Sequence, residues 1–276
     1  MVPFHISDLS LTFFAQGRPY TIQSDHPNFD HIRKTLLLGD FESADLVALT
    51  DIKASITVAS NGKLEFDGDG LLYNGTPIHN VWADKILLFR KEGLSFDPIF
   101  KALESLYRNP SFAARERLPL FVERSRLGFL PDGRITAFKV IKSNWHDSYT
   151  GTFDNSIGKL VEMPRADVDD DWQHTCSPGL HLGALEYIPT YGLYKSDRRV
   201  VLCAFWPEDA VAIPKDYDGS KLRVCRYEVM SEVDKKFIAD FVESHQTVVA
   251  AEDDDDDDDY ADDDDYDENS AQFGGL

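Results

Sequence analysis

Three side chains that could do chemistry lie within eight residues of one another: His174, Cys176 and His181. A cysteine beside a histidine can form a thiolate–imidazole pair, in which the thiolate acts as a nucleophile. Asp154 or Asn155 could orient the imidazole ring. Cys176 and His181 are therefore candidate catalytic residues. We favour the competing interpretation, a small buried cysteine and a hydrogen-bonded structural histidine, because nearness in sequence does not establish geometry.

The same side chains could instead hold a metal ion. His174, Cys176 and His181 would supply three ligands, and His146 or Cys203 would supply the fourth. Structural zinc sites normally bring their ligands in closely spaced pairs, and this segment has no such pairs. We therefore expect no metal and no other cofactor.

Four aspartates, Asp167, Asp169, Asp170 and Asp171, form a short acidic cluster in the same segment. Carboxylate oxygens are the ligands that Ca²⁺ and Mg²⁺ prefer. The cluster lacks the glycine turn and the terminal glutamate of an EF-hand loop. A solvated loop is the interpretation we favour.

A second enzymatic hypothesis uses Lys139, His181, Tyr187 and Glu228. A strand, a glycine-rich loop and the run GLHLGALEYIPTYG are loosely similar to ADP-ribosyltransferase-type folds, in which a tyrosine lines a nicotinamide pocket. Tyr187 is on this basis a third candidate catalytic residue. The alternative is a core aromatic on a short helix. Taken together, these patterns favour a protein that is not an enzyme.

The elements that must position these side chains are strands. Residues 135–141, 199–205 and 221–229 are rich in β-prone residues and flank a loop-rich segment with irregularly spaced glycines. Loops held between strands are where binding sites usually lie. We therefore assign binding roles to residues of this segment: His146, Asp154, Asn155, His174 and Gly179.

The composition excludes several classes of protein. Of the net charge of −21, fourteen acidic side chains lie between residues 252 and 268, which leaves about −7 on the rest. The rest has no basic region suited to nucleic acid. Three cysteines without paired spacing indicate a reducing compartment. The sequence has no leader in which an apolar run follows a basic stretch, and it has no apolar run of about 20 residues. We therefore expect a soluble intracellular protein.

The first 130 residues predict a small α+β domain. Expected strands are a hairpin in 9–22 and further strands in 56–78, where Asn74-Gly75 indicates a tight turn. Expected helices are one capped by Asn28 and ended by Gly39, and others at 41–49, 81–91, 97–107 and 112–122.

The fold class we predict is α+β with a domain boundary at the turn Pro131-Asp132-Gly133. Residues 1–130 form the first domain, and residues 131–250 form a β-rich mixed domain that ends in a helix from Glu232 to Gln246. Residues 251–276 form a disordered polyaspartate tail, because like charges at almost every position repel. We favour an interaction role for the tail over a purely solubilising one. One such role is mimicry of a phosphate backbone, in which the tail competes with DNA for a basic surface.

Three long motifs resemble the rIIB family of T-even and related bacteriophages. They are AFKVIKSNWHDSYTGTFDNSIGKLVEMPR (residues 137–165), DDDWQHTCSPGLH (169–181) and DAVAIPKDYDGSKLRVCRYEV (209–229). Weaker similarity extends upstream through LLYNGTPI and FKALESLYRNPS. The family pattern also has an N-terminal segment resembling a helix-turn-helix, to which this sequence shows no counterpart. The polyaspartate tail is not part of the pattern.

The resemblance implies a phage accessory protein made early in infection. Members of the family protect the infection from prophage exclusion and premature lysis, beside an rIIA-like partner and in association with the host inner membrane. The expected location is accordingly the host bacterial cytoplasm, with peripheral contact with that membrane. We expect the acidic tail to contact a basic protein surface and expect no direct binding of nucleic acid.

Overall fold

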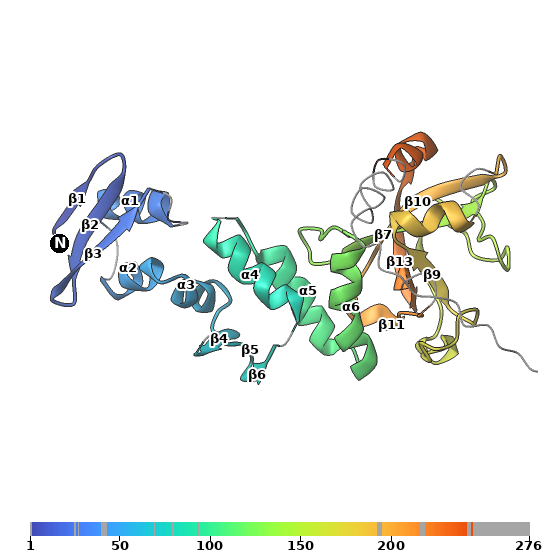
Figure 1. The fold of residues 1–276 in the computed structure, drawn as a ribbon, viewed down its shortest axis with the longest axis horizontal. Helices are drawn as coiled ribbons and strands as arrows, with labels where there is room; N and C mark the ends of the chain where they lie inside the picture. The colour runs from blue at the N-terminus through green and yellow to red at the C-terminus, as the bar shows by residue number, and fades with distance from the viewer. Residues whose placement is uncertain are drawn as a thin grey trace, which may run out of the picture.

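The computed structural model describes residues 2–24, 26, 28–39, 43–68, 70–78, 80–92, 94–191, 195–215, 219–241 and 244. Within these ranges helices and sheets are mixed, which confirms the α+β class. A small sheet lies at the N-terminal end of the molecule, helices lie in the middle and the largest sheet lies at the other end (Figure 1). None of the helices in these ranges has the length and apolar character needed to cross a membrane. The acidic tail expected at 251–276 is outside the described residues.

The N-terminal part has a three-stranded sheet and two helices. These are β1 (Phe4–Ile6), β2 (Ser10–Ala15), β3 (Arg18–Gln23), α1 (Phe29–Leu38) and α2 (Ser43–Thr50). The predicted hairpin is confirmed: Gln16 and Gly17, between β2 and β3, have φ of 50° and 78°, as a tight two-residue turn requires. Phe13, Ile32 and Leu46 are fully buried in a small core of this part.

A short helix and a second three-stranded sheet follow. They are α3 (Ile52–Ala59), β4 (Leu64–Asp67), β5 (Gly70–Tyr73) and β6 (Thr76–Pro77). The turn predicted at Asn74-Gly75 is confirmed between β5 and β6. The strand expected from residue 56 was wrong, because those residues are helical. Asp51 caps this helix by accepting hydrogen bonds from the backbone N–H groups of Lys53 (2.8 Å) and Ala54 (3.3 Å).

Three helices form the middle of the molecule: α4 (Val81–Lys91), α5 (Asp97–Arg108) and α6 (Phe112–Arg124). All three begin at the predicted residues, and α5 and α6 end one and two residues beyond the predicted ends. The Asn80 and Ser111 side chains cap the first turns of α4 and α6. Asn28 lies at the N-cap position of α1, as predicted, but its side chain makes no capping hydrogen bond. It donates to the Leu49 carbonyl (2.7 Å) and accepts from Arg90 (2.6 Å) instead.

The C-terminal part is a seven-stranded antiparallel sheet in the order β11-β12-β9-β7-β10-β13-β8. Its elements are β7 (Ile135–Lys142), β8 (Leu160–Glu162), η1 (Arg165–Asp167), β9 (Leu180–Gly183), η2 (Leu185–Tyr191), β10 (Arg198–Phe205), η3 (Pro207–Asp209), β11 (Ala210–Ala212), β12 (Lys221–Val224) and β13 (Arg226–Val233). The single strand expected at 221–229 is divided at Cys225. The Cys225 N–H donates to Asp209 O and the Cys225 carbonyl accepts from Met163 N–H, both at 2.9 Å.

One apolar core joins the middle helices to one face of this sheet. Leu103 and Leu118 from the helices share it with Ala137, Phe205 and Tyr227 from the strands. The core therefore contains residues from both sides of position 130. The domain division at 130/131 stays a prediction.

The opposite face of the sheet has a smaller core of Val140, Ile188, Val200 and Ile238. The C-terminal helix expected from Glu232 begins later, because β13 runs to Val233 and residues 235–241 are helical. Fully buried Ile238 packs this helix onto the sheet, as expected.

Candidate functional site

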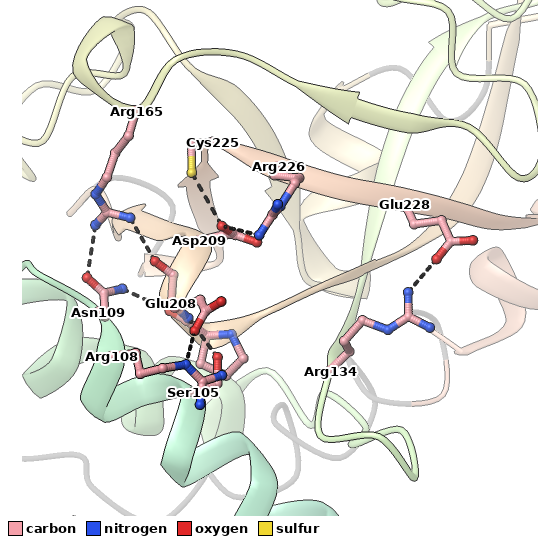
Figure 2. Close-up of polar contacts among 11 residues, drawn as sticks. Ser105, Arg108, Asn109, Arg134, Arg165, Glu208, Asp209, Cys225, Arg226 and Glu228 are labelled. Atoms are coloured by element: carbon pink, nitrogen blue, oxygen red, sulfur yellow. Dashed lines mark hydrogen bonds and ion pairs between the residues drawn. The ribbon is translucent and has the colours of Figure 1, made fainter.

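The turn between β10 and β11 is anchored to α5 and the residue after it by hydrogen bonds. Asn109, just after α5, donates from Nδ2 to the carbonyls of Pro207 (2.8 Å) and Ala210 (2.7 Å). Figure 2 shows Asn109 and its contact with Arg165. The Ser105 hydroxyl accepts from the Glu208 N–H at 3.1 Å. Because Asn109 is only 1% exposed, these bonds form away from water and hold the turn firmly against the helix.

Arg165 of η1 holds the same turn from a second side. It donates from Nη1 to the Glu208 carbonyl (2.8 Å) and from Nη2 to Asn109 Oδ1 and to the Ala210 carbonyl (both 2.9 Å). Arg108 forms an ion pair with the Glu208 carboxylate. Segments far apart in sequence thus fix the position of the turn and of Asp209 at its end.

Asp209 forms a two-point ion pair with Arg226 of β13. Arg226 donates from Nε to Oδ2 (3.0 Å) and from Nη2 to Oδ1 (3.2 Å). Burial raises the pKa of Asp209, and the hydrogen bonds from Arg226 partly offset this rise. The Cys225 sulfur lies 3.7 Å from Asp209 Oδ1, and burial raises the pKa of its thiol. The cysteine therefore stays protonated and is a poor nucleophile.

A second ion pair lies on the same face of the sheet. Arg134, just before β7, pairs with Asp132 through Nε (2.7 Å). It also pairs with Glu228 through Nη1, as Figure 2 shows. Glu228 and Arg226 are two residues apart on β13, so their side chains point to the same face.

A pocket of about 230 Å³ lies between these two ion pairs. It is lined by Arg134, Leu160, Ala204, Phe205, Trp206, Asp209, Arg226, Tyr227 and Glu228. Two guanidinium groups, two carboxylates and the Trp206 ring give it both signs of charge and an aromatic wall. Such a pocket can hold a charged side chain of a partner, which would exchange with one of the ion pairs.

The loop that contains His174 and Cys176 is held in place by two side chains of β12. Arg223 is fully buried and donates to the Asp171 carbonyl (2.5 Å) and to the Ser177 hydroxyl. Lys221 donates to the Thr175 carbonyl at 2.5 Å. A cation that donates to loop carbonyls serves to hold the backbone in place. The contacts thus give this loop a fixed conformation.

His174 points back to the acidic cluster of its own loop. Its Nδ1 lies 2.8 Å from Asp169 Oδ2, and its Nε2 lies 3.6 Å from Asp171 Oδ2. Hydrogen bonds from the Asp171 N–H, Ser177 and His174 hold the pKa of Asp169 far below its usual value. Asp169 is therefore ionised across the physiological range and pairs with the histidine and, at 3.6 Å, with Arg223.

Cys176 and His181 differ in their surroundings. Cys176 is exposed on the loop, whereas His181 is half-buried on β9. In the described part of the chain, no hydrogen bond joins the Cys176 sulfur to the His181 ring. Burial first, and then the nearby cations Lys139, Lys221 and Arg223, lower the pKa of His181 to about 4. A histidine with so low a pKa is a weak general base at neutral pH.

Lys139, Tyr187 and Glu228, the other residues of the second enzymatic hypothesis, each contact different partners. Lys139 donates to the His181 carbonyl (2.8 Å) and lies above the Tyr227 ring, 5.5 Å from its centre. Burial lowers the pKa of Lys139. Tyr187 is buried against Gly183, and Glu228 belongs to the ion pair with Arg134.

Four of the residues assigned binding roles have hydrogen bonds or packing contacts within the protein itself. Buried Asn155 accepts from the Tyr227 hydroxyl, and Asp154 accepts from the Ser156 hydroxyl at 2.6 Å. His146 Nδ1 lies 2.9 Å from the Asn144 carbonyl. Gly179 leaves room for Arg223, since an added Cβ would lie 3.1 Å from Arg223 Cδ. These contacts do not test a binding role, and the assignments stay predictions. Within the described ranges, no three His, Cys, Asp or Glu side chains converge as metal ligands.

Sequence reasoning missed the two ion pairs of the pocket. One signal for them was available: Arg226 and Glu228 alternate with apolar residues along a predicted strand, so opposite charges share one face. No sequence signal indicated Asn109 or Arg165, because each acts across more than forty positions of the chain.

Comparisons with known proteins agree with the resemblance noted in the sequence. The model of the family described as "Bacteriophage T4 protein rIIB" matches residues 4–247. The chain is also 36% identical over 212 residues to "Protein rIIB" of Enterobacteria phage T4, across 77% of this chain and 67% of that protein. No solved structure matches the chain. The matched region spans the N-terminal sheet, the middle helices and the seven-stranded sheet, and the chain therefore belongs to the rIIB family of bacteriophage proteins.

Proposed function

We propose that this chain is a phage accessory protein that protects an infection from prophage exclusion and premature lysis. It acts by binding an rIIA-like protein of the same phage rather than by catalysis. The observation that carries the proposal is the family match over residues 4–247, which includes all the elements described above. The shared sequence covers 77% of this chain and 67% of the T4 protein, so an activity that depends on the shared part of the fold is expected to be common to both.

The geometry of the predicted catalytic residues supports a binding role. Cys176 is exposed and has no hydrogen bond to His181 in the described part of the chain, and the pKa of His181 is lowered to about 4. A thiolate–histidine nucleophile needs these two groups within hydrogen-bonding distance. The acidic charge of the chain, −21, supports a protein partner with basic groups and disfavours DNA. We place the protein in the host cytoplasm with peripheral contact with the inner membrane.

The test is genetic. The gene is deleted from the phage, and plating is compared on a host that carries an excluding prophage and on the same host without it. We expect plating to fall only on the lysogen and to be restored by the wild-type chain from a plasmid. Cys176→Ala should restore it equally. Equal plating of the deletion phage on both hosts would contradict the protective role, and failure of Cys176→Ala with an intact fold would contradict the non-enzymatic mechanism.

A further inference from the structure

The seven-stranded sheet has two very different edges. At one edge, all three residues of β11 are buried. At the other edge, β8 pairs with β13 on one side, and no described strand pairs with its other side. An open edge offers backbone N–H and C=O groups to an added strand, and proteins usually cover such edges or keep them short and charged. β8 is short, as protected edges are, but exposed apolar side chains lie along it.

The hydrogen bonds around β8 show which backbone groups face outward. Val229 N–H donates to Lys159 O, and Met163 N–H donates to Cys225 O, both at 2.9 Å. In an antiparallel pair, alternate residues point their N–H and C=O groups to the partner strand. Lys159, Val161 and Met163 therefore face β13. Leu160 and Glu162 turn their backbone N–H and C=O groups to the open edge.

Apolar side chains accompany these outward groups. Leu160 is 58% exposed and Ile157, just before the strand, is 55% exposed, whereas Val161 of β8 is buried in the core. The charged neighbour Lys159 is turned to Asp154, with 3.4 Å between Nζ and Oδ2. Exposed apolar residues beside unpaired backbone groups are typical of surfaces that receive an added strand.

The edge is continuous with the pocket. Leu160 lies opposite Glu228 and Glu162 lies opposite Arg226 in the register of β8 and β13, so these four side chains share one face. Leu160 is also part of the pocket lining. A strand added to β8 would place alternate side chains beside Leu160 and Glu162, next to the pocket.

We infer that the open edge of β8 receives an extended segment of the protein partner by strand addition. The segment carries an apolar residue beside Leu160 and a lysine or arginine two positions away beside Glu162. This inference rests on the proposed function, since it supplies the contact surface for the partner. The exposed carboxylate of Glu162 favours a basic segment, and β8 of a second copy of this chain (Leu160–Glu162) has no lysine or arginine to place beside it.

The experiment measures amide hydrogen exchange, residue by residue, in the full-length chain alone and mixed with the rIIA-like protein of the same phage. We expect the amides of Leu160 and Glu162 to exchange fast in the free chain and slowly in the complex. The amide of Val161 should be slow in both. Protection of Leu160 and Glu162 without the partner, growing with protein concentration, would show that a second copy occupies the edge and would overturn the inference.

Two variants test the same inference by binding affinity, without measuring amide hydrogen exchange. Leu160→Pro removes the outward N–H without removing a hydrogen bond to β13, and we expect binding roughly tenfold weaker with an unchanged melting temperature. Leu160→Lys keeps the N–H but brings a charge to the edge and should also weaken binding. Its matched control is Leu9→Lys, because Leu9 is 74% exposed in the N-terminal part and should leave binding unchanged.

The outcomes separate this inference from the proposed function. If the partner binds but Leu160 and Glu162 stay fast and both Leu160 variants bind like the wild type, strand addition at β8 is wrong and the proposed function stands. If no complex forms with the wild-type chain, the proposed partnership itself is wrong. Should Leu160→Pro fail to fold, Leu160→Lys and the exchange rates of the wild-type chain still decide.

Discussion

Asn28 and Asn109 are both buried asparagines that join the end of a helix to a distant segment, and each shares its carbonyl oxygen with an arginine. Asn28, before α1, accepts from Arg90 at 2.6 Å, and Asn109, after α5, accepts from Arg165 at 2.9 Å. The two junctions differ in what surrounds them. Around Asn109 the helices and the sheet share one apolar core, whereas the residues that follow Asn28 belong to the separate N-terminal core.

This difference indicates that the same side chain can have two roles. Asn109 adds specificity to a junction that apolar packing already stabilises, and its loss leaves several polar groups inside a large core. Asn28 joins two cores, so its loss should loosen the N-terminal part without unfolding the sheet. Parts of a protein with separate cores can open separately, with different free energies.

The largest effect is expected for Asn109→Ala. The substitution leaves the Pro207 and Ala210 carbonyls and the Arg165 guanidinium short of partners in a buried place. We expect the free energy of unfolding to fall by about 3 kcal/mol in urea denaturation, in a single transition. Asn144→Ala, at an exposed asparagine, is the control and should change it little. Equal effects of the two substitutions would show that the anchored turn does not stabilise the sheet.

A smaller and more local effect is expected for Asn28→Ala. It removes the bonds to the Leu49 carbonyl and to Arg90, and we expect a loss of about 1 to 2 kcal/mol. Amide exchange should become faster in β1, β2, β3 and α1 and stay unchanged in β7 and β10. Faster exchange throughout the molecule would contradict the separation of the two cores.

The loop after β7 is held by the Asp147 carboxylate, which accepts hydrogen bonds from Thr150, Thr152 and Phe153. Unlike the two asparagines, this group should respond to acid. Burial would raise the pKa of Asp147, but hydrogen bonds from the Phe153 and Thr150 N–H groups and the Thr150 hydroxyl hold it at about 2. Because the folded-state pKa lies below the ordinary value, the carboxylate contributes stability above that value. This contribution is lost as the pH falls from about 4 to about 2.

We expect Asp147→Asn to lower the free energy of unfolding at about pH 6 by about 1 kcal/mol, a figure reduced to allow for solvent screening. The difference between variant and wild type should shrink on acidification. Asp170→Asn, at an exposed aspartate, is the control. A difference that stays constant with pH would show that the loop does not depend on the charge of Asp147.

The smallest effect is expected for Cys176→Ala. Cys176 is exposed, so its removal creates no cavity and leaves no polar group unpaired. We expect the melting temperature to stay unchanged. A clear drop in melting temperature would show that the loop of Cys176 packs more tightly than its exposure indicates.

Local signals predicted most of the elements. Caps and apolar spacing located α4, α5 and α6, and Asn74-Gly75 located a turn. The strand expected from residue 56 was wrong because Ile56, Thr57 and Val58 have high β-propensity, whereas the Asp51 cap and the burial of Ile56 in the core favour helix. For this segment, packing in the core outweighs the local β-propensity.

The site was less predictable than the fold. The segment with Cys176 and His181 was recognised as loop-rich, but nothing in the sequence shows that Arg223 is buried beside it. The anchored turn depends on Asn109 and Arg165, whose partners are distant in sequence. Such pairs arise only when the sheet order is fixed, and no local pattern encodes that order. The open edge of β8 likewise depends on the order of the strands in the sheet, so no local pattern predicts it.

The most direct measurement of the central claim is the mass of the full-length chain mixed with the rIIA-like protein of the same phage, by light scattering. We predict a complex heavier than either protein at low salt, weakened at about 1 M salt, where charges are screened beyond about 3 Å. Under the low-salt conditions the chain alone should not shift duplex DNA. Two separate masses at every salt concentration, together with tight DNA binding, would contradict the account.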